Sequence, residues 1–204
     1  MAKKHEDTSG DLSLDRLVFF SDAVFAIAIT LLVLEIRIPH LGRGQPNVAY
    51  WQALLDLVPS FFAFALSFLV IGRFWMGHHE RYAALDRFDA RLLWPNTLYL
   101  MAIAFMPFST AFLGANLGNF VPALVYNVTM VVLGLLAMWV ARRVSTVSGK
   151  ADPNGYGLDI VLAGLTCVVL TWIFPPASQC GMMTVPLWAS LERRLSYRKS
   201  ATAS

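Results

Sequence analysis

The sequence contains little charge for its length. Asp, Glu, Lys and Arg make up 14% of the 204 residues, whereas 57% are hydrophobic, and the mean hydropathy is +0.57. Residues 92–141 and residues 160–191 contain no Asp, Glu, Lys or Arg at all. A water-soluble domain needs more surface charge, and a buried helix of about 10–14 residues is too short to account for such runs. These absences argue against a soluble globular fold and predict segments that cross a membrane.

The sequence is also poor in cysteine and lacks the motifs of common enzymes. Its two cysteines, Cys167 and Cys180, do not have the spacing of a metal site and give no basis for a disulfide. No catalytic triad can be assembled from the polar residues, and no glycine-rich phosphate loop occurs. His78 and His79 are adjacent and would point about 100° apart on a helix, so they are poorly placed to chelate one ion. We therefore expect no enzymatic activity, no cofactor and no resident metal.

Six apolar segments are predicted to cross the membrane as helices. The turn residues between Gly114 and Asn119 separate the third segment from the fourth, and Pro175-Pro176 separates the fifth from the sixth. The segments are residues 17–34, about 54–76, about 92–113, about 121–140, about 158–174 and about 176–191. The predicted fold class is an all-α membrane protein. A six-helix domain over residues 14–195 is expected between an N-terminal tail (1–13) and a C-terminal tail (196–204).

The basic residues divide unevenly between the two sides of this predicted bundle. With the N-terminus inside, 14 of the 16 Lys and Arg residues fall on the inner side, and only Arg37 and Arg43 fall outside. Such asymmetry is typical of the positive-inside rule. It predicts a multi-pass protein of the cell (inner) membrane with both termini cytoplasmic. It also explains the basic pI through membrane topology, so nucleic acid is not an expected partner.

Asp22 is the residue of the first segment that most needs an explanation. An ionisable group inside a membrane helix is costly unless it faces water or a partner. On an ideal helix Ile27, Leu31 and Leu34 form one apolar stripe, and Asp22 lies about 140° from Ile27. If the stripe faces a pore, Asp22 and Ser21 face neighbouring helices. Donors at the same membrane depth are available in Trp75, His78 and Asn96, and we expect these five polar residues to form a buried cluster.

The sequence resembles the transmembrane protein 175 family, which includes endolysosomal potassium channels of animals and shorter prokaryotic relatives. The resemblance covers roughly the first 115 residues. It is carried by four motifs: Arg16-x-x-x-Phe20-Ser21-Asp22, Phe74-Trp75-x-x-His78-His79, Asn96-Thr-Leu-Tyr-Leu, and Phe105-Met-Pro107-Phe108-Ser-Thr110.

The resemblance implies a potassium-preferring cation channel in which the first helix lines the pore. By position relative to the Phe20-Ser21-Asp22 motif, Ile27, Leu31 and Leu34 would narrow the pore and Thr30 would contribute to selectivity. No Thr-Val-Gly-Tyr-Gly loop occurs, so a filter of backbone carbonyls is not expected. The animal proteins carry two six-helix repeats and this chain carries one, which implies a homotetramer in membrane lipid. The motif residues Arg16, Phe20, Ser21, Asp22, Trp75, His78 and Asn96 are expected to hold the assembly together.

Two other interpretations remain open from the sequence. A proton-coupled secondary transporter, or a proton-permeable channel, would use Asp22 and His78 as a relay. An integral membrane enzyme or a structural partner is a third possibility, weakened by the missing catalytic constellation. Arg16 lies within about 20° of Ile27 on the ideal helix, and it would either line the inner mouth of the pore or cap Asp22.

Overall fold

The computed structural model describes residues 2–149 and 157–184, and every regular element in these residues is helical. The elements are α1 (Ala2–Leu34), α2 (Asn47–Asp56), α3 (Val58–Tyr82), the 3₁₀ helix η1 (Ala90–Leu92), α4 (Leu93–Ala115), α5 (Phe120–Ser148), α6 (Leu158–Ile173) and the 3₁₀ helix η2 (Pro175–Thr184). The prediction of an all-α protein is confirmed.

Four of these stretches are long and apolar enough to cross a membrane. They are Ser13–Leu34, Val58–Tyr82, Ala90–Ala115 and Phe120–Ser148, and α6 is a shorter apolar helix. A bundle of six membrane segments fits this arrangement, with α1, α3, α4, α5 and α6 supplying five of them. The sixth predicted segment begins as the 3₁₀ helix η2 and not as an α-helix, and Pro175 and Pro176 mark its boundary with α6. The rest of that segment and the C-terminal tail lie outside the described residues.

Two further boundaries differ from the prediction. The second segment was expected from about residue 54, but a break at Leu57 separates the short helix α2 from α3. Pro59 follows this break at the start of α3, where its missing amide hydrogen costs nothing because the first amides of a helix have no intrahelical acceptor. At the other end of the first segment, α1 begins at Ala2, so residues 2–13 of the predicted N-terminal tail are helical.

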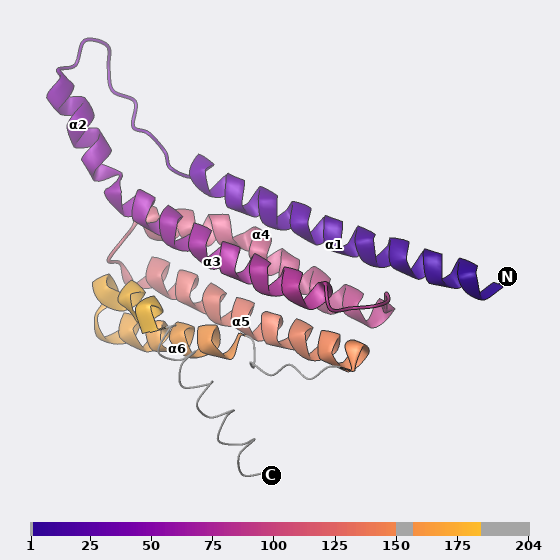
Figure 1. Ribbon diagram of the computed structural model, residues 1–204. Coiled ribbons are helices and arrows are strands. Elements are labelled where there is room, and N and C mark those ends of the chain that lie inside the picture. The colour runs from indigo at the N-terminus through magenta and orange to yellow at the C-terminus, as the bar shows by residue number, and fades with distance from the viewer. Residues whose placement is uncertain (1, 150–156, 185–204) are drawn as a thin grey trace.

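The helices pack in an order that leaves α1 at one edge of the bundle (Figure 1). Within the described residues α1 packs only against α3 and α4, whereas α5 packs against α4 and α6. Small residues allow the close approach of α5 to α6: a Cβ added to Gly134 would lie 2.6 Å from Val161, and one added to Gly164 would lie 2.9 Å from Val131. One face of α1 is therefore packed, and the opposite face is left uncovered by the rest of the protomer.

Candidate functional site

The packed face of α1 is defined by residues that recur every three or four positions. Leu17, Ser21, Phe25, Ala28 and Leu32 are all buried. This spacing places them on one side of a helix, where α3 and α4 cover them. The register of α1 is thereby fixed, and with it the direction in which the other side chains point.

The predicted pore stripe lies on the uncovered face of α1. Ile27 is 58% exposed, Leu31 41% and Leu34 73%, and Thr30 is also exposed. Large aliphatic side chains left uncovered along a membrane helix contact either lipid or a further protein surface. The structure thus places all four residues together, on the side of α1 that points away from its own bundle.

Thr30 is the polar member of this face, and its hydroxyl bonds to its own helix. The hydroxyl oxygen lies 3.0 Å from the carbonyl oxygen of Ala26 and 2.9 Å from that of Ile27, so the hydroxyl hydrogen is directed to the backbone. The lone pairs of the oxygen then remain on the exposed side. Thr30 therefore presents a hydrogen-bond acceptor between the aliphatic side chains of Ile27 and Leu34.

On the packed face, Ser21, Asn96 and His78 form a buried hydrogen-bonded chain that joins three helices. The amide nitrogen Nδ2 of Asn96 donates to Ser21 Oγ at 2.9 Å, and Oδ1 of Asn96 lies 2.8 Å from His78 Nε2. The Ser21 hydroxyl in turn donates to the Leu17 carbonyl at 2.8 Å. All three side chains are almost completely buried. The chain connects α1, α4 and α3 in one polar contact.

The hydrogen bonds determine which nitrogen of His78 carries the proton. Because Nδ2 of Asn96 faces Ser21, its Oδ1 faces His78 and can only accept, so Nε2 is the protonated nitrogen. The other nitrogen, Nδ1, is buried and has no hydrogen-bond partner among the residues that the structure describes. The rings of Tyr82, Phe25 and Tyr99 surround the imidazole at centroid distances of 4.2, 5.6 and 6.0 Å. A neutral imidazole fits these surroundings.

The remaining motif residues do not join this buried chain. Trp75 Nε1 donates to Asp22 Oδ1 at 2.8 Å, linking α3 to α1 at a partly exposed position. The predicted five-residue cluster is therefore divided into a buried chain of three and this separate pair. The side chains of Arg16 and Phe20 are exposed on the protomer, on the uncovered part of α1.

An ion pair between Arg73 and Asp159 was not predicted from the sequence. Its partners lie on α3 and in the first turn of α6, and Asp159 is almost completely buried. The sequence could have indicated this pair. Asp159 lies at the start of an apolar helix, and such a carboxylate needs a partner, as Asp22 does. The pair ties the α5–α6 side of the bundle to the helix that carries Trp75 and His78.

A second buried polar group, also not predicted, connects α3, α4 and α5. Ser67 Oγ lies 3.0 Å from Tyr126 Oη and 2.8 Å from Thr110 Oγ1, and Thr110 also reaches the Met106 carbonyl at 2.8 Å. All three hydroxyl-bearing side chains are buried. Such hydroxyl contacts are a common means of holding membrane helices together.

In the part of the chain that carries α1, α3 and α4, the sequence is similar to proteins described as potassium channels. Residues 16–107 match the family model described as the endosomal/lysosomal potassium channel TMEM175. A protein named as a potassium channel from Streptomyces collinus is 42% identical over 131 residues, which cover 61% of this chain and 62% of that protein. One from Chamaesiphon minutus is 44% identical over 102 residues, which cover 50% of each chain. The chain thus aligns with between half and two thirds of the length of these relatives.

The fold comparison extends further along the chain. The crystal structure of a Chamaesiphon minutus homologue of the lysosomal potassium-selective channel TMEM175 superposes with a TM-score of 0.66 at 27% identity. It covers 90% of this chain and 98% of that one. Residues 16–107, which carry the motif of α1 and the Ser21–Asn96–His78 chain, thus match the TMEM175 family model, and the fold resembles that of a bacterial TMEM175 homologue.

Proposed function

We propose that four copies of this chain form a potassium-preferring cation channel in which α1 lines the central pore. The observation that carries the proposal is the uncovered face of α1, where Ile27, Leu31 and Leu34 stand exposed beside Thr30. A single helix cannot enclose a pathway, whereas symmetry-related copies around an axis can. The names of the relatives, potassium channels in both cases, support potassium as the permeant ion.

In this proposal the aliphatic side chains form a hydrophobic constriction. A narrow ring of such side chains excludes water and gates by dewetting, so Ile27, Leu31 and Leu34 would set the barrier. Thr30, with its oxygen lone pairs on the same face, would assist partial dehydration of the cation. Selectivity would then come from the cost of removing water from each ion, without a cage of backbone carbonyls.

The charge distribution supports a position in the cell (inner) membrane with both termini cytoplasmic. Under this topology the Ser21–Asn96–His78 chain and the Trp75–Asp22 pair lie in the cytoplasmic half. They would hold α1 in register against α3 and α4, and Arg16 would sit at the inner mouth of the pore. Residues 14–195 would form the channel domain.

The test is potassium flux into liposomes that contain the purified protein. Ile27→Asn places a hydratable amide at the constriction, so the flux should rise or the preference for potassium over sodium should fall. Ile38→Asn is the matched control, because Ile38 is 77% exposed but lies beyond the end of α1. The proposal fails if the wild-type protein and the Ile27, Leu31 and Leu34 variants are all silent in folded, tetrameric form.

The alternative of a proton-coupled transporter through Asp22 and His78 makes a different prediction. It requires saturable, proton-coupled uptake that Asp22→Asn abolishes. Two observations weigh against it: Asp22 bonds to Trp75 and not to His78, and His78 is held by Asn96 with its other nitrogen enclosed by aromatic rings. A relay needs a continuous path between its members.

A further inference from the structure

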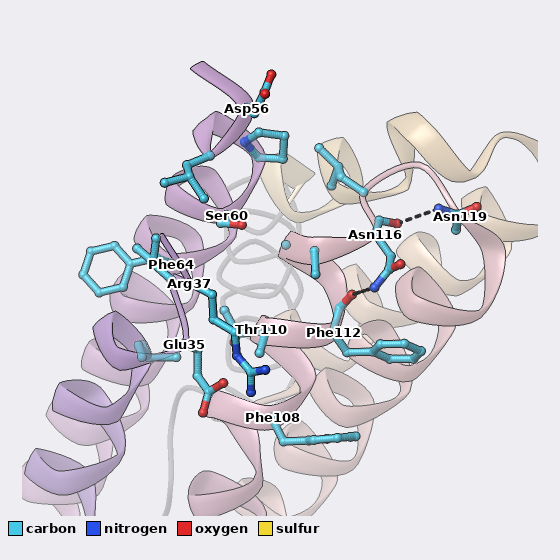
Figure 2. Close-up of a pocket in the computed structure, with 18 residues that line it drawn as sticks. Glu35, Arg37, Asp56, Ser60, Phe64, Phe108, Thr110, Phe112, Asn116 and Asn119 are labelled. Atoms are coloured by element: carbon cyan, nitrogen blue, oxygen red, sulfur yellow. Dashed lines mark hydrogen bonds between the residues drawn. The ribbon is translucent and has the colours of Figure 1, made fainter. Parts of the chain in front are cut away.

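A cavity of about 640 Å³ lies between α1, α3 and α4, at the end of the bundle where α1 ends and α3 begins. Its volume is within the range of small-ligand sites, about 300–1,000 Å³. Figure 2 shows the side chains of Glu35 and Arg37 between the ribbons of α3 and α4, with Ser60 on α3, Thr110 on α4 and Asn116 just beyond the end of α4. The cavity therefore combines a mainly apolar lining with a few polar and charged side chains at its open side.

The charged groups of the cavity carry both signs. Arg37 contributes a guanidinium and Glu35 a carboxylate, whereas the carboxylate of Asp56 accepts a hydrogen bond from Gln52 and points away from both in Figure 2. Among the described residues the only ion pair within 4.0 Å joins Arg73 to Asp159, so Arg37 does not neutralise either carboxylate directly. The cavity thus offers one anion-binding group, Arg37, and one cation-binding group, Glu35, to a ligand.

One wall of the cavity is apolar and leads onto the exposed surface of α4. Phe108 is 56% exposed, and its ring stacks with that of Phe112 at a centroid distance of 6.2 Å and contacts Phe105 at 5.1 Å. Phe64 of α3 and Leu32 of α1 contribute further apolar surface to the lining. A ligand with a charged head in the cavity could extend a hydrocarbon chain along these rings.

We propose that this cavity binds the headgroup of a zwitterionic phospholipid that carries a primary ammonium, as in phosphatidylethanolamine. The phosphate would bind Arg37, whose planar guanidinium can donate two parallel hydrogen bonds to phosphate oxygens. The ammonium would bind the carboxylate of Glu35, which lies beside Arg37 (Figure 2). An anionic lipid such as phosphatidylglycerol fits less well, because it offers no cation to the carboxylate of Glu35.

A divalent cation is a weaker fit for the same cavity. No cluster of three or more His, Cys, Asp or Glu side chains suitable for a metal occurs in the part of the chain that the structure describes. The guanidinium of Arg37 would also repel a metal ion held by the neighbouring carboxylate of Glu35. Because the last turn of α1 forms one wall, a bound headgroup would hold the end of the helix proposed to line the pore. The binding itself does not depend on that proposal.

The test is native mass spectrometry of the delipidated, full-length protein titrated with phosphatidylethanolamine, phosphatidylglycerol or glycerophosphoethanolamine. We expect phosphatidylethanolamine to bind several-fold more tightly than the other two. Arg37→Gln should weaken its binding about tenfold, the effect of one lost charge-assisted contact. Arg43→Gln is the matched control, because Arg43 lies in the same connection but not in the cavity lining, and its binding should stay within about twofold of wild type.

A charge change at Glu35 provides an independent variant. Glu35→Lys replaces a cation-binding group with a cation, so the preference should shift from phosphatidylethanolamine towards phosphatidylglycerol. Equal binding of the two lipids by the wild type would overturn the proposal, as would an Arg37→Gln protein that binds like wild type. Equally tight binding of glycerophosphoethanolamine would also overturn it, because the ligand would then be a soluble phosphoester and not a lipid.

Discussion

Nε2 of His78 lies 2.8 Å from Oδ1 of Asn96, and the same amide group reaches Ser21 on a third helix. Asn96 is therefore the one side chain whose two polar atoms both bridge helices in this contact. An amide suits the position because it is both donor and acceptor. An aspartate there would lack the N–H group that donates to Ser21. A leucine would lack both that donor and the oxygen that accepts from His78.

Asn96→Leu is expected to destabilise the protomer by about 2–4 kcal/mol, because it leaves buried polar groups of Ser21 and His78 without their partner. The measurement is the thermal stability of the detergent-solubilised protein followed by size-exclusion chromatography. Asn47→Leu is the control, since Asn47 is exposed on α2 and should tolerate the change. Equal melting of the two variants would mean that the buried chain contributes little.

Trp75→Phe removes the hydrogen bond to Asp22 while it keeps an aromatic ring in place. Because the pair is partly exposed, the expected loss is about 1 kcal/mol. Trp94→Phe provides the matched control, as Trp94 is 74% exposed on α4. Both variants are compared with wild type by chemical crosslinking of the assembled protein. A lower fraction of the largest crosslinked species is expected for Trp75→Phe alone.

Removal of Arg73 leaves the carboxylate of Asp159 buried and without its cationic partner. Arg73→Gln should therefore destabilise the protein by about 2–4 kcal/mol, with the lower end favoured because the Arg73 side chain is 45% exposed. Arg73→Gln combined with Asp159→Asn should recover part of this loss, since the uncompensated charge is gone. Strictly additive effects in the double-mutant cycle would contradict a direct interaction between the two.

Thr30→Ala should reduce the preference for potassium over sodium while potassium flux persists. The hydroxyl supplies an acceptor on the exposed face of α1, and the loss of about 1 kcal/mol of differential stabilisation corresponds to about a fivefold change in the selectivity ratio. Thr30→Ser retains the hydroxyl and should stay close to wild type. Paired potassium and sodium flux assays in liposomes make this comparison, and an unchanged ratio in Thr30→Ala would exclude a selectivity role for the hydroxyl.

The features that could be predicted from the sequence are those encoded by local pattern. Helical spacing predicted that Ile27, Leu31 and Leu34 share one face of the helix and that Ser21 lies on another. In the structure the first three are exposed and Ser21 is buried. The helices over α3, α4, α5 and α6 followed from hydrophobic runs between turn residues. Ser21, His78 and Asn96 were grouped because their positions in the predicted topology gave them the same depth.

The features that were missed depend on tertiary partners. The ion pair of Arg73 with Asp159 joins residues 86 positions apart, and no periodicity relates them. The division of the polar cluster depends on side-chain direction: the adjacent residues Ser21 and Asp22 point to different neighbours. The short helix α2 was missed because only its last residues, from about 54, fell within the second predicted segment, and the break at Leu57 that ends α2 was not predicted.

The central claim is that the uncovered face of α1 lines the ion pathway, and cysteine accessibility tests it most directly. In a background with Cys167 and Cys180 replaced by alanine, single cysteines are placed at Ile27, Thr30, Leu31 and Leu34, and at Ala28 on the packed face. Potassium flux is then measured before and after addition of a charged, membrane-impermeant thiol reagent. We expect block at one or more of the four stripe positions and no block at Ala28. Unchanged flux in all four stripe variants, with Ala28→Cys equally unaffected, would contradict a pore lined by this face.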